Sequence, residues 1–446
     1  MHRKFIIYIS LIAFSANVSA QDARTFSLEE ALAYGVQNNL QLKQAEMDIK
    51  ISQSKVREIT AIGLPQVNAE ASYNNFIDIP TQVAEASAFD PSAPAGLLVP
   101  LQFGLPHSLT GGITASQLLF DGSYFVGLKS AKEFMKYSEL GAERTESEVK
   151  TGISQTYINA IAAEENIEAL EENKKNIEQI YLETSKFYEV GFLEKQDADQ
   201  VRLLKSSIAN QLDFANRQHE AVLNLLKFQM GIPVNETITL TDNIETLIDM
   251  GSDIALSLIN QTFSPTNHID YQTVMQGERL SELSLSNTRT GYYPQLSAFF
   301  THSQNSFSND FGDIVDKFYP TTLWGLQLNV PIFSSGMRYM KTQQSKLELE
   351  KTRSQKTMLE QSLTMQAINA ANSYKSALER YEVLTDDLEL AKTIKETTRI
   401  KFNEGLASSS ELTQAESQYL TTLGNYINTT IELLNAKLNL VTAYGI

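Results

Sequence analysis

Residues 63–73 read GLPQVNAEASY, and they mark a change from a helix to a strand. A helical pattern stops at Pro65, and from Val67 onward every second residue is apolar while the residues between are polar. Strict alternation of this kind is typical of a β-strand with one apolar and one polar face. The same change from a helical to an alternating pattern occurs at residues 291–303, GYYPQLSAFFTHS, around Pro294. The chain is therefore expected to switch twice from a helix to a strand.

The strands that follow these switches have lengths suited to a membrane. Alternating patterns predict four of them, near residues 66–78, 108–120, 295–305 and 321–333. Each covers about 10–13 residues, the length of a tilted strand that spans a bilayer. One apolar and one polar face suit a β-barrel with lipid outside and water inside. A soluble antiparallel sheet with one wet face is the alternative.

Four strands are too few to close around a channel. Even eight strands leave room only for side chains or one small ligand. An open sheet edge in lipid would leave backbone groups unpaired, at a cost of several kcal/mol for each group. The pattern therefore predicts that several chains each contribute four strands.

Further landmarks recur in the same order along the chain. GITASQLLFDG at residues 112–122 matches GLQLNVPIFSSG at 325–336, and YEVGFLEKQDADQ at 188–200 matches FNEGLASSSELTQ at 402–414. Matched landmarks in one order predict an internal tandem repeat. The predicted domains are a first repeat over residues 21–235, a linker or collar over 236–265 and a second repeat over 266–446.

Long helices are predicted between these landmarks. Residues 337–404 contain neither Gly nor Pro, and as one helix they would span about 100 Å. In the first half, a coiled-coil spacing links Ile167, Leu170, Ile177, Tyr181, Thr184 and Tyr188. Near the start, Ser27 and Glu30 have the spacing of a capping box, which predicts the beginning of the first helix.

The first twenty residues have the features of a secretory signal. A basic start is followed by an apolar core from Phe5 to Phe14 and by small residues up to Ala20. Cleavage is predicted near Ala20. Gln21 follows instead of Cys, so no lipidation is expected.

Composition argues against several other classes of protein. The chain has no cysteine, which excludes disulfides and thiolate metal sites, and a net charge of −17 argues against binding nucleic acid. The five histidines are scattered, and no hydrolase, metalloprotease or phosphate-loop motif is present. We therefore predict no catalytic residue, no metal site and no cofactor.

Taken together, these residues resemble the TolC-like outer-membrane efflux protein family. The resemblance rests on SLEEALAYGVQNNLQL at residues 27–42, the two proline switches, the strand exits LLFDG and PIFSSG, and two G-x5-[DE] turns. It implies a membrane β-barrel plus an all-α coiled-coil tunnel. Three chains with four strands each would form a trimeric twelve-stranded barrel, which a long α-helical barrel continues across the periplasm.

The resemblance also implies that the long helical hairpins turn at two periplasmic tips that dock an adaptor protein. The tips would lie at Gly191 and Gly405, and the second has Glu404 where the family has Val. The candidate adaptor-binding residues are Val190, Gly191, Phe192, Gly405, Leu406 and Ala407. A plain glycine at a helix end, with no partner, is the alternative.

In the family, acidic residues near the second tip narrow the periplasmic mouth. Glu411 lies six residues after Gly405, whereas Gln414 replaces the family's second acid. The candidate aperture residues are Glu411, Gln414, Asp197, Gln200, Phe402 and Tyr188. The alternative for Glu411 is a solvated acid in the first turn of a helix, stabilised by the helix dipole.

The implied function is a passive exit channel of a tripartite efflux or secretion system. Its expected partners are two further copies of the chain, a periplasmic adaptor, an inner-membrane transporter and outer-membrane lipid. The tracts 78–106 and 303–320 would cap the barrel outside the cell, and the first could either constrict the exit or pack on the rim. A secreted trimeric coiled-coil structural or adhesive protein is the main alternative, and a general porin is another.

Overall fold

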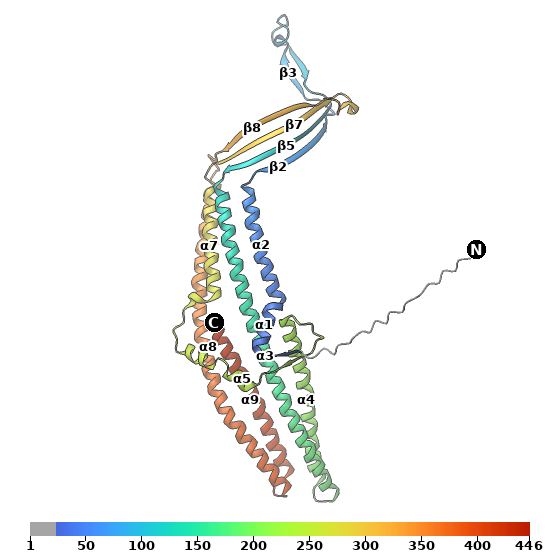
Figure 1. Cartoon of the computed structure of the whole chain (residues 1–446), viewed down its shortest axis with the longest axis vertical. Coiled ribbons are helices and arrows are strands. Elements are labelled where there is room, and N and C mark those ends of the chain that lie inside the picture. Colours follow the sequence, from blue (N-terminus) through green and yellow to red (C-terminus); the bar gives the residue numbers. More distant parts are fainter. Residues whose placement is uncertain (1–23) are drawn as a thin grey trace, which may run out of the picture. The chain divides into compact units, whose positions relative to one another are not determined.

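The computed structural model describes residues 24–446, whose helices and strands are drawn in Figure 1. These residues form two compact units. The predicted signal peptide lies outside the described residues. Unit 1 comprises residues 24–40, 147–261 and 369–442, and unit 2 comprises 41–146, 262–368 and 443–446. Two long helices, α3 (Gly122–Glu189) and α8 (Met337–Asn403), contribute residues to both units.

Unit 2 contains a four-stranded antiparallel sheet in the order β2-β5-β7-β8. Its strands are β2 (Gln66–Asn75), β5 (His107–Phe120), β7 (Gln295–Ser308) and β8 (Tyr319–Asn329). These are the four strands that alternation predicts, with shifted ends. The last strand stops at Asn329, two residues before Pro331, because proline has no N–H to donate to a ladder.

The sheet has two chemically different faces. In the register, Glu70, Gly112, Ser303 and Thr321 lie in one row, and Ala69, Ile113, His302 and Thr322 lie in the next row on the opposite face. We call the second the apolar face, since it also carries Val67, Ala115, Phe300, Trp324, Leu326 and Leu328. Trp324 is 77% exposed, so this chain alone leaves much of the apolar face uncovered.

Four short strands were not predicted. β3 (Thr81–Glu85) and β4 (Leu98–Gln102) form a hairpin with the 3-10 helix η1 (Ala86–Ala88) inside a tract expected to be a loop. Pro100 is tolerated in β4 because both strands of a two-stranded ribbon are edges. In unit 1, β1 (Arg24–Phe26) pairs in parallel with β6 (Ile238–Leu240). The prediction of four strands in the chain was therefore incomplete.

Two helices of unit 2 end at the proline switches. α2 (Leu40–Ile62) stops before Pro65, and α7 (Ile269–Thr290) stops before Pro294. Because proline lacks an N–H and restricts the residue before it, it favours the change to extended backbone. Unit 2 also contains the 3-10 helices η2 (Pro265–Asn267) and η3 (Phe311–Asp313).

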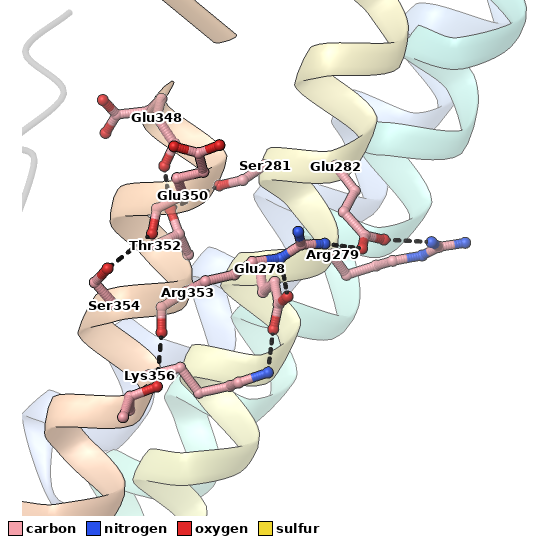
Figure 2. A network of polar contacts seen from close by, with 11 residues as sticks. Glu278, Arg279, Ser281, Glu282, Glu348, Glu350, Thr352, Arg353, Ser354 and Lys356 are labelled. Atoms are coloured by element: carbon pink, nitrogen blue, oxygen red, sulfur yellow. Dashed lines mark hydrogen bonds and ion pairs between the residues drawn. The ribbon is translucent and has the colours of Figure 1, made fainter. Parts of the chain in front are cut away.

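Ion pairs attach α7 to α8 (Figure 2). The Glu278 carboxylate accepts hydrogen bonds from Arg353 Nε at 2.9 Å and from Lys356 Nζ at 2.5 Å. These hydrogen bonds, with the Lys356 bond the strongest influence, lower the pKa of Glu278. On α3, the Glu133 carboxylate accepts a hydrogen bond of 2.9 Å from Gln276 of α7. Polar contacts therefore connect α7 to both long helices of its unit.

Unit 1 is helical and contains the predicted coiled-coil seam. Besides parts of α3 and α8, its helices are α1 (Leu28–Asn38), α4 (Lys195–Met230), α5 (Ile244–Asp249), α6 (Ser252–Ile259) and α9 (Ser409–Ala443). The predicted capping box is confirmed, since Ser27 and Glu30 exchange hydrogen bonds of 3.2 and 2.9 Å. Of the seam residues, Leu170, Ile177 and Thr184 are buried, whereas Tyr188 is 43% exposed. The buried seam therefore ends before the tip.

A lysine of α9 binds the segment between the halves at the end of α5. Lys437 of α9 donates hydrogen bonds to the carbonyl oxygens of Leu247, Ile248 and Met250, at 2.7, 2.8 and 2.8 Å. These carbonyls lie at the end of α5, where a cation also interacts favourably with the helix dipole. Burial lowers the pKa of Lys437 to about 8.

Candidate functional site

The two tips have the same backbone geometry. Gly191 follows α3 with φ of 80°, and Gly405 follows α8 with φ of 74°. At each tip the glycine N–H bonds three residues back, and the next N–H bonds five residues back, to Phe187 or Lys401. This pattern is the Schellman motif, in which glycine provides the left-handed conformation. A Cβ atom at either glycine would meet no other atom within 4 Å. Glycine is therefore needed for its backbone conformation and not because space is short.

Large apolar side chains are exposed at both tips. Val190 is 67% exposed and Phe192 is 81% exposed at the first tip, and Leu406 is 78% exposed at the second. Ala407 differs, because it packs against a buried cluster of the hairpins. Three of the candidate adaptor-binding side chains are therefore available for contact, and Ala407 supports the turn from within.

Phe402 lies in the hydrophobic core of unit 1. It is 8% exposed and belongs to a buried cluster with Ile177, Ile180, Val201, Ile208 and Leu412. Those residues come from α3, α4 and α9, so Phe402 packs the two hairpins against each other. The phenyl ring is therefore a packing contact within unit 1, and its role at an aperture stays a prediction.

Asp197 and Gln200 join the two hairpins through a serine. The buried Ser409 hydroxyl lies within hydrogen-bond distance of an Asp197 carboxylate oxygen and 3.2 Å from Gln200 Oε1. Asp197 also accepts a hydrogen bond of 3.2 Å from the Glu194 N–H at the start of α4. Ser409 was not predicted, because nothing in the run of serines from 408 to 410 distinguishes the buried one.

Glu411 is fixed at the start of α9 by a capping box. Its Oε2 accepts hydrogen bonds from the Ser408 N–H at 2.7 Å and from the Ser408 hydroxyl at 3.0 Å. The Ser408 hydroxyl in turn accepts from the Glu411 N–H at 3.2 Å. The backbone hydrogen bond from Ser408 lowers the pKa of Glu411, so this exposed carboxylate is charged at neutral pH. Gln414, one turn further along α9, is also exposed.

A buried group of charges beyond the tips was not predicted. Lys395 of α8 donates a hydrogen bond of 3.3 Å to Asn173 of α3 and lies over the Tyr419 ring of α9. Glu416, only 1% exposed, has one carboxylate oxygen without a hydrogen bond within the described residues. Burial lowers the pKa of Lys395 and raises the pKa of Glu416, and their mutual attraction opposes both changes. In the sequence, these residues look like the charged residues on any solvent-exposed helix face, so their burial could not be predicted.

The described residues offer no cluster for a metal ion. Across residues 24–446, no group of three or more His, Cys, Asp or Glu side chains could hold one. Over the same residues, no helix combines the length and the apolar character needed to cross a membrane.

Comparison with known families identifies the chain. Residues 35–228 and 280–446 match the family model described as outer membrane efflux protein. The chain belongs to the outer membrane efflux protein family. The resemblance that its repeated motifs indicate is therefore confirmed.

Relatives of this outer membrane efflux protein are similar over most of their length. The antibiotic efflux pump outer membrane protein ArpC and the probable efflux pump outer membrane protein TtgC, both from Pseudomonas putida, are each 22% identical to it. Each match covers 96% of this chain and 82% of the relative. These comparisons support an outer-membrane efflux channel and do not favour a secreted coiled-coil protein.

Solved structures show the same fold. The CmeC outer membrane channel of Campylobacter jejuni superimposes with a TM-score of 0.71 at 20% identity, covering 94% of this chain and 85% of CmeC. The outer membrane protein VceC of Vibrio cholerae has a TM-score of 0.69 at 14% identity, covering 94% of this chain and 96% of VceC. This outer membrane efflux protein therefore has the fold of known outer-membrane channels.

Proposed function

We propose that three copies of this chain form a twelve-stranded barrel in the outer membrane, with four strands from each copy. The observation that carries the proposal is the open sheet of unit 2. β2 and β8 are its edges, and the apolar face is uncovered. Pairing β8 of one copy with β2 of the next removes both edges, and lipid then covers the apolar face.

The polar face of the sheet supports a water-filled interior. Thr114 and Thr301 lie 3.1 Å apart through their hydroxyls, and Thr110 donates to Asn305 at 3.0 Å. These residues share a face with Asn68 and Glu70, and barrels in lipid orient such faces toward water. The repeats over residues 21–235 and 266–446 would each supply two of the four strands, and the segment 236–265 would form a collar around the helices.

The helices continue this barrel as a tunnel through the periplasm. The chain is a passive duct in this proposal, so an inner-membrane transporter supplies the energy and the substrate. A periplasmic adaptor contacts the exposed tip residues Val190, Phe192 and Leu406, while Gly191, Gly405 and Ala407 maintain the turns. Because the relatives include antibiotic and toluene efflux pump components, small organic compounds are the first substrates to test.

The mouth of the tunnel lies near the second tip. Glu411 supplies one fixed negative charge per chain, and Gln414 lies beside it on α9. A ring of three such charges would attract cations. Asp197, Gln200 and Phe402 act behind the mouth by holding the hairpins together, and Tyr188 lies exposed at the end of α3.

Cysteine cross-linking tests the assembly directly, because the natural chain contains no cysteine. Pairs are introduced with one cysteine on β2, at Asn68 or Ser72, and one on β8, at Thr321 or Leu323. Oxidation of isolated outer membranes should link up to three chains, as seen by denaturing electrophoresis, with the matching single variants as controls. Absence of linked chains for every pair would contradict the barrel.

A further inference from the structure

The apolar face of the sheet carries a hollow that no part of the proposed transport path uses. Its volume is about 440 Å³. On the apolar face it is lined by Ala69, Ala71, Gly111, Ile113, His302 and Gln304, and Glu70 and Gly112, which belong to the opposite face in the register, also border it. A Cβ atom added at Gly111 would meet nothing within 4 Å, so the space above this glycine is open. Small residues therefore create a depression on a face that is otherwise bulky.

Two polar side chains of the apolar face border the hollow. His302 Nδ1 lies 2.7 Å from Thr322 Oγ1, and Gln304 Nε2 lies 3.4 Å from His302 Nε2. The Gln304 amide N–H can donate to the facing His302 ring nitrogen, while the other ring nitrogen contacts Thr322. Within the described residues, Gln304 makes no other side-chain hydrogen bond, which leaves one N–H and its carbonyl oxygen available.

The hollow lies a short distance below an aromatic cluster at the outer end of the strands. Tyr73 and His107 lie on the same face as the hollow and share a hydrogen bond of 2.8 Å, and the Phe311 ring packs 5.5 Å from Tyr73. Such aromatic groups mark the interface between lipid and water. Gly111 lies four residues from His107 along β5, about 10 Å along the membrane normal for a strand tilted by 45°.

At that depth the surroundings change from polar headgroups to acyl chains. Polar side chains on a lipid-facing surface are costly unless they find a partner, and such positions commonly have a function. The linkage between an acyl chain and its headgroup combines an apolar chain with a carbonyl acceptor. That combination matches the apolar floor and the available N–H of Gln304.

We propose that the hollow binds one acyl chain of a membrane lipid, and that Gln304 donates a hydrogen bond to the ester carbonyl of that chain. This inference rests on the proposed barrel, because the apolar face must lie in lipid. It assigns Gly111 the role of leaving space for the chain and His302 the role of orienting the Gln304 amide. The headgroup would lie toward Tyr73 and His107.

Native mass spectrometry of the full-length, detergent-solubilised protein tests the site, with phosphatidylethanolamine added as the probe. Gly111→Leu fills the hollow, and Gln304→Leu removes the donor. Ala298→Leu is the control, since it adds an apolar side chain to the same face outside the hollow. The wild type and the control should retain one lipid per chain. Retention should be abolished in Gly111→Leu and weakened about fivefold in Gln304→Leu, the effect of one lost hydrogen bond.

Trp324, the single tryptophan of the chain, separates failure of this site from failure of the barrel. It lies on the apolar face, so phospholipids with brominated chains should quench its fluorescence after reconstitution. Quenching together with unchanged lipid retention in Gly111→Leu or Gln304→Leu would overturn the lipid site alone. Equal loss in Ala298→Leu would also overturn it. Absence of quenching would contradict the barrel itself.

Discussion

The Lys395 ammonium on α8 lies 3.8 Å from the centre of the Tyr419 ring on α9. A cation over an aromatic face is attracted by the ring, most strongly where water is excluded. The same lysine bonds Asn173 on α3, so one side chain connects three helices of unit 1. Glu416 completes this buried group with a carboxylate oxygen that no described residue satisfies.

Glu416→Gln is expected to increase the stability of unit 1 at pH 7. Burial raises the pKa of Glu416 despite the nearby Lys395 and Arg399, so the charged form is disfavoured in the folded state. The stability that the protonated carboxyl contributes is present below the unfolded pKa and is lost as the pH rises through the folded pKa. The neutral amide of Glu416→Gln avoids the cost of burying a carboxylate, so thermal unfolding in detergent should show a gain of about 1 kcal/mol.

The control for this experiment is Glu411→Gln, for which the expected change in stability at pH 7 has the opposite sign. The pKa of Glu411 is lowered by the Ser408 hydrogen bonds, so its contribution is present at neutral pH and is lost as the pH falls through the folded pKa. Glu411→Gln should therefore lower stability at pH 7. A decrease of stability in both variants would contradict the interpretation of Glu416.

Ser409→Ala is expected to loosen the contact between the hairpins. The substitution removes the hydroxyl whose single hydrogen is shared between Asp197 and Gln200, at a cost of about 1–2 kcal/mol. In planar bilayers, the variant should show a higher conductance or more frequent open events than the wild type. Ser410→Ala is the matched control, since that neighbouring serine is exposed and should have no effect.

The charge at the mouth is expected to control cation block. Glu411→Gln should weaken block of the single-channel current by divalent cations, because each chain loses one fixed carboxylate. Gln414→Glu should strengthen the block, since it adds a charge one turn away on the same exposed part of α9. Unchanged block in both variants would remove Glu411 and Gln414 from the aperture.

The tips are expected to bind the adaptor through their apolar side chains. Phe192→Asp and Leu406→Asp should each reduce adaptor recovery in pull-down experiments at least about tenfold, since a charge replaces an anchor at a buried contact. Trimers should remain intact on native gels. Ile77→Asp, at a 93% exposed position of unit 2, is the control. Normal recovery with both tip variants would exclude the tips as the docking site.

Lys437→Met is expected to release α5 from α9. Three carbonyl oxygens lose their donor, which should reduce the free energy of unfolding by about 2 kcal/mol. The pKa of Lys437 is lowered from 10.5 to about 8, so the folded protein loses a proton before the unfolded chain does. The free energy of unfolding of the wild type should therefore rise as the pH increases from about 8 to 10.5, and that of Lys437→Met should not. Equal pH dependence in both proteins would contradict this account.

Residue patterns were sufficient to predict the main elements of the fold. Alternation around Val67 and Leu326 identified strands, and the absence of Gly and Pro after Met337 identified a helix that the structure ends at Asn403. The resemblance to the family placed Gly191 and Gly405 at turns, and both glycines have the left-handed conformation that suits such turns. The short strands β1 and β6 were not predicted, because three residues are too few to show an alternation of apolar and polar side chains.

The contacts between hairpins could not be predicted in the same way. Phe402, Ser409 and Lys395 each depend on residues far away in the sequence, and their neighbours resemble ordinary helix residues. The resemblance to the family suggested an aperture role for Phe402, which stays a prediction, and it gave no sign of the packing of Phe402 in the core of unit 1. Periodicity identifies which face of a helix is apolar, but it does not identify the helix that packs against that face.

The open edges β2 and β8 have a consequence for inheritance. In the proposed ring of three copies, every seam needs one edge from each of two neighbours, so a single subunit with a damaged β8 would leave a gap. Cells that produce sound and damaged subunits in equal amounts would form complete rings in only about one assembly in eight. Mutations on these strands should therefore be dominant, whereas null alleles of the same gene should be recessive.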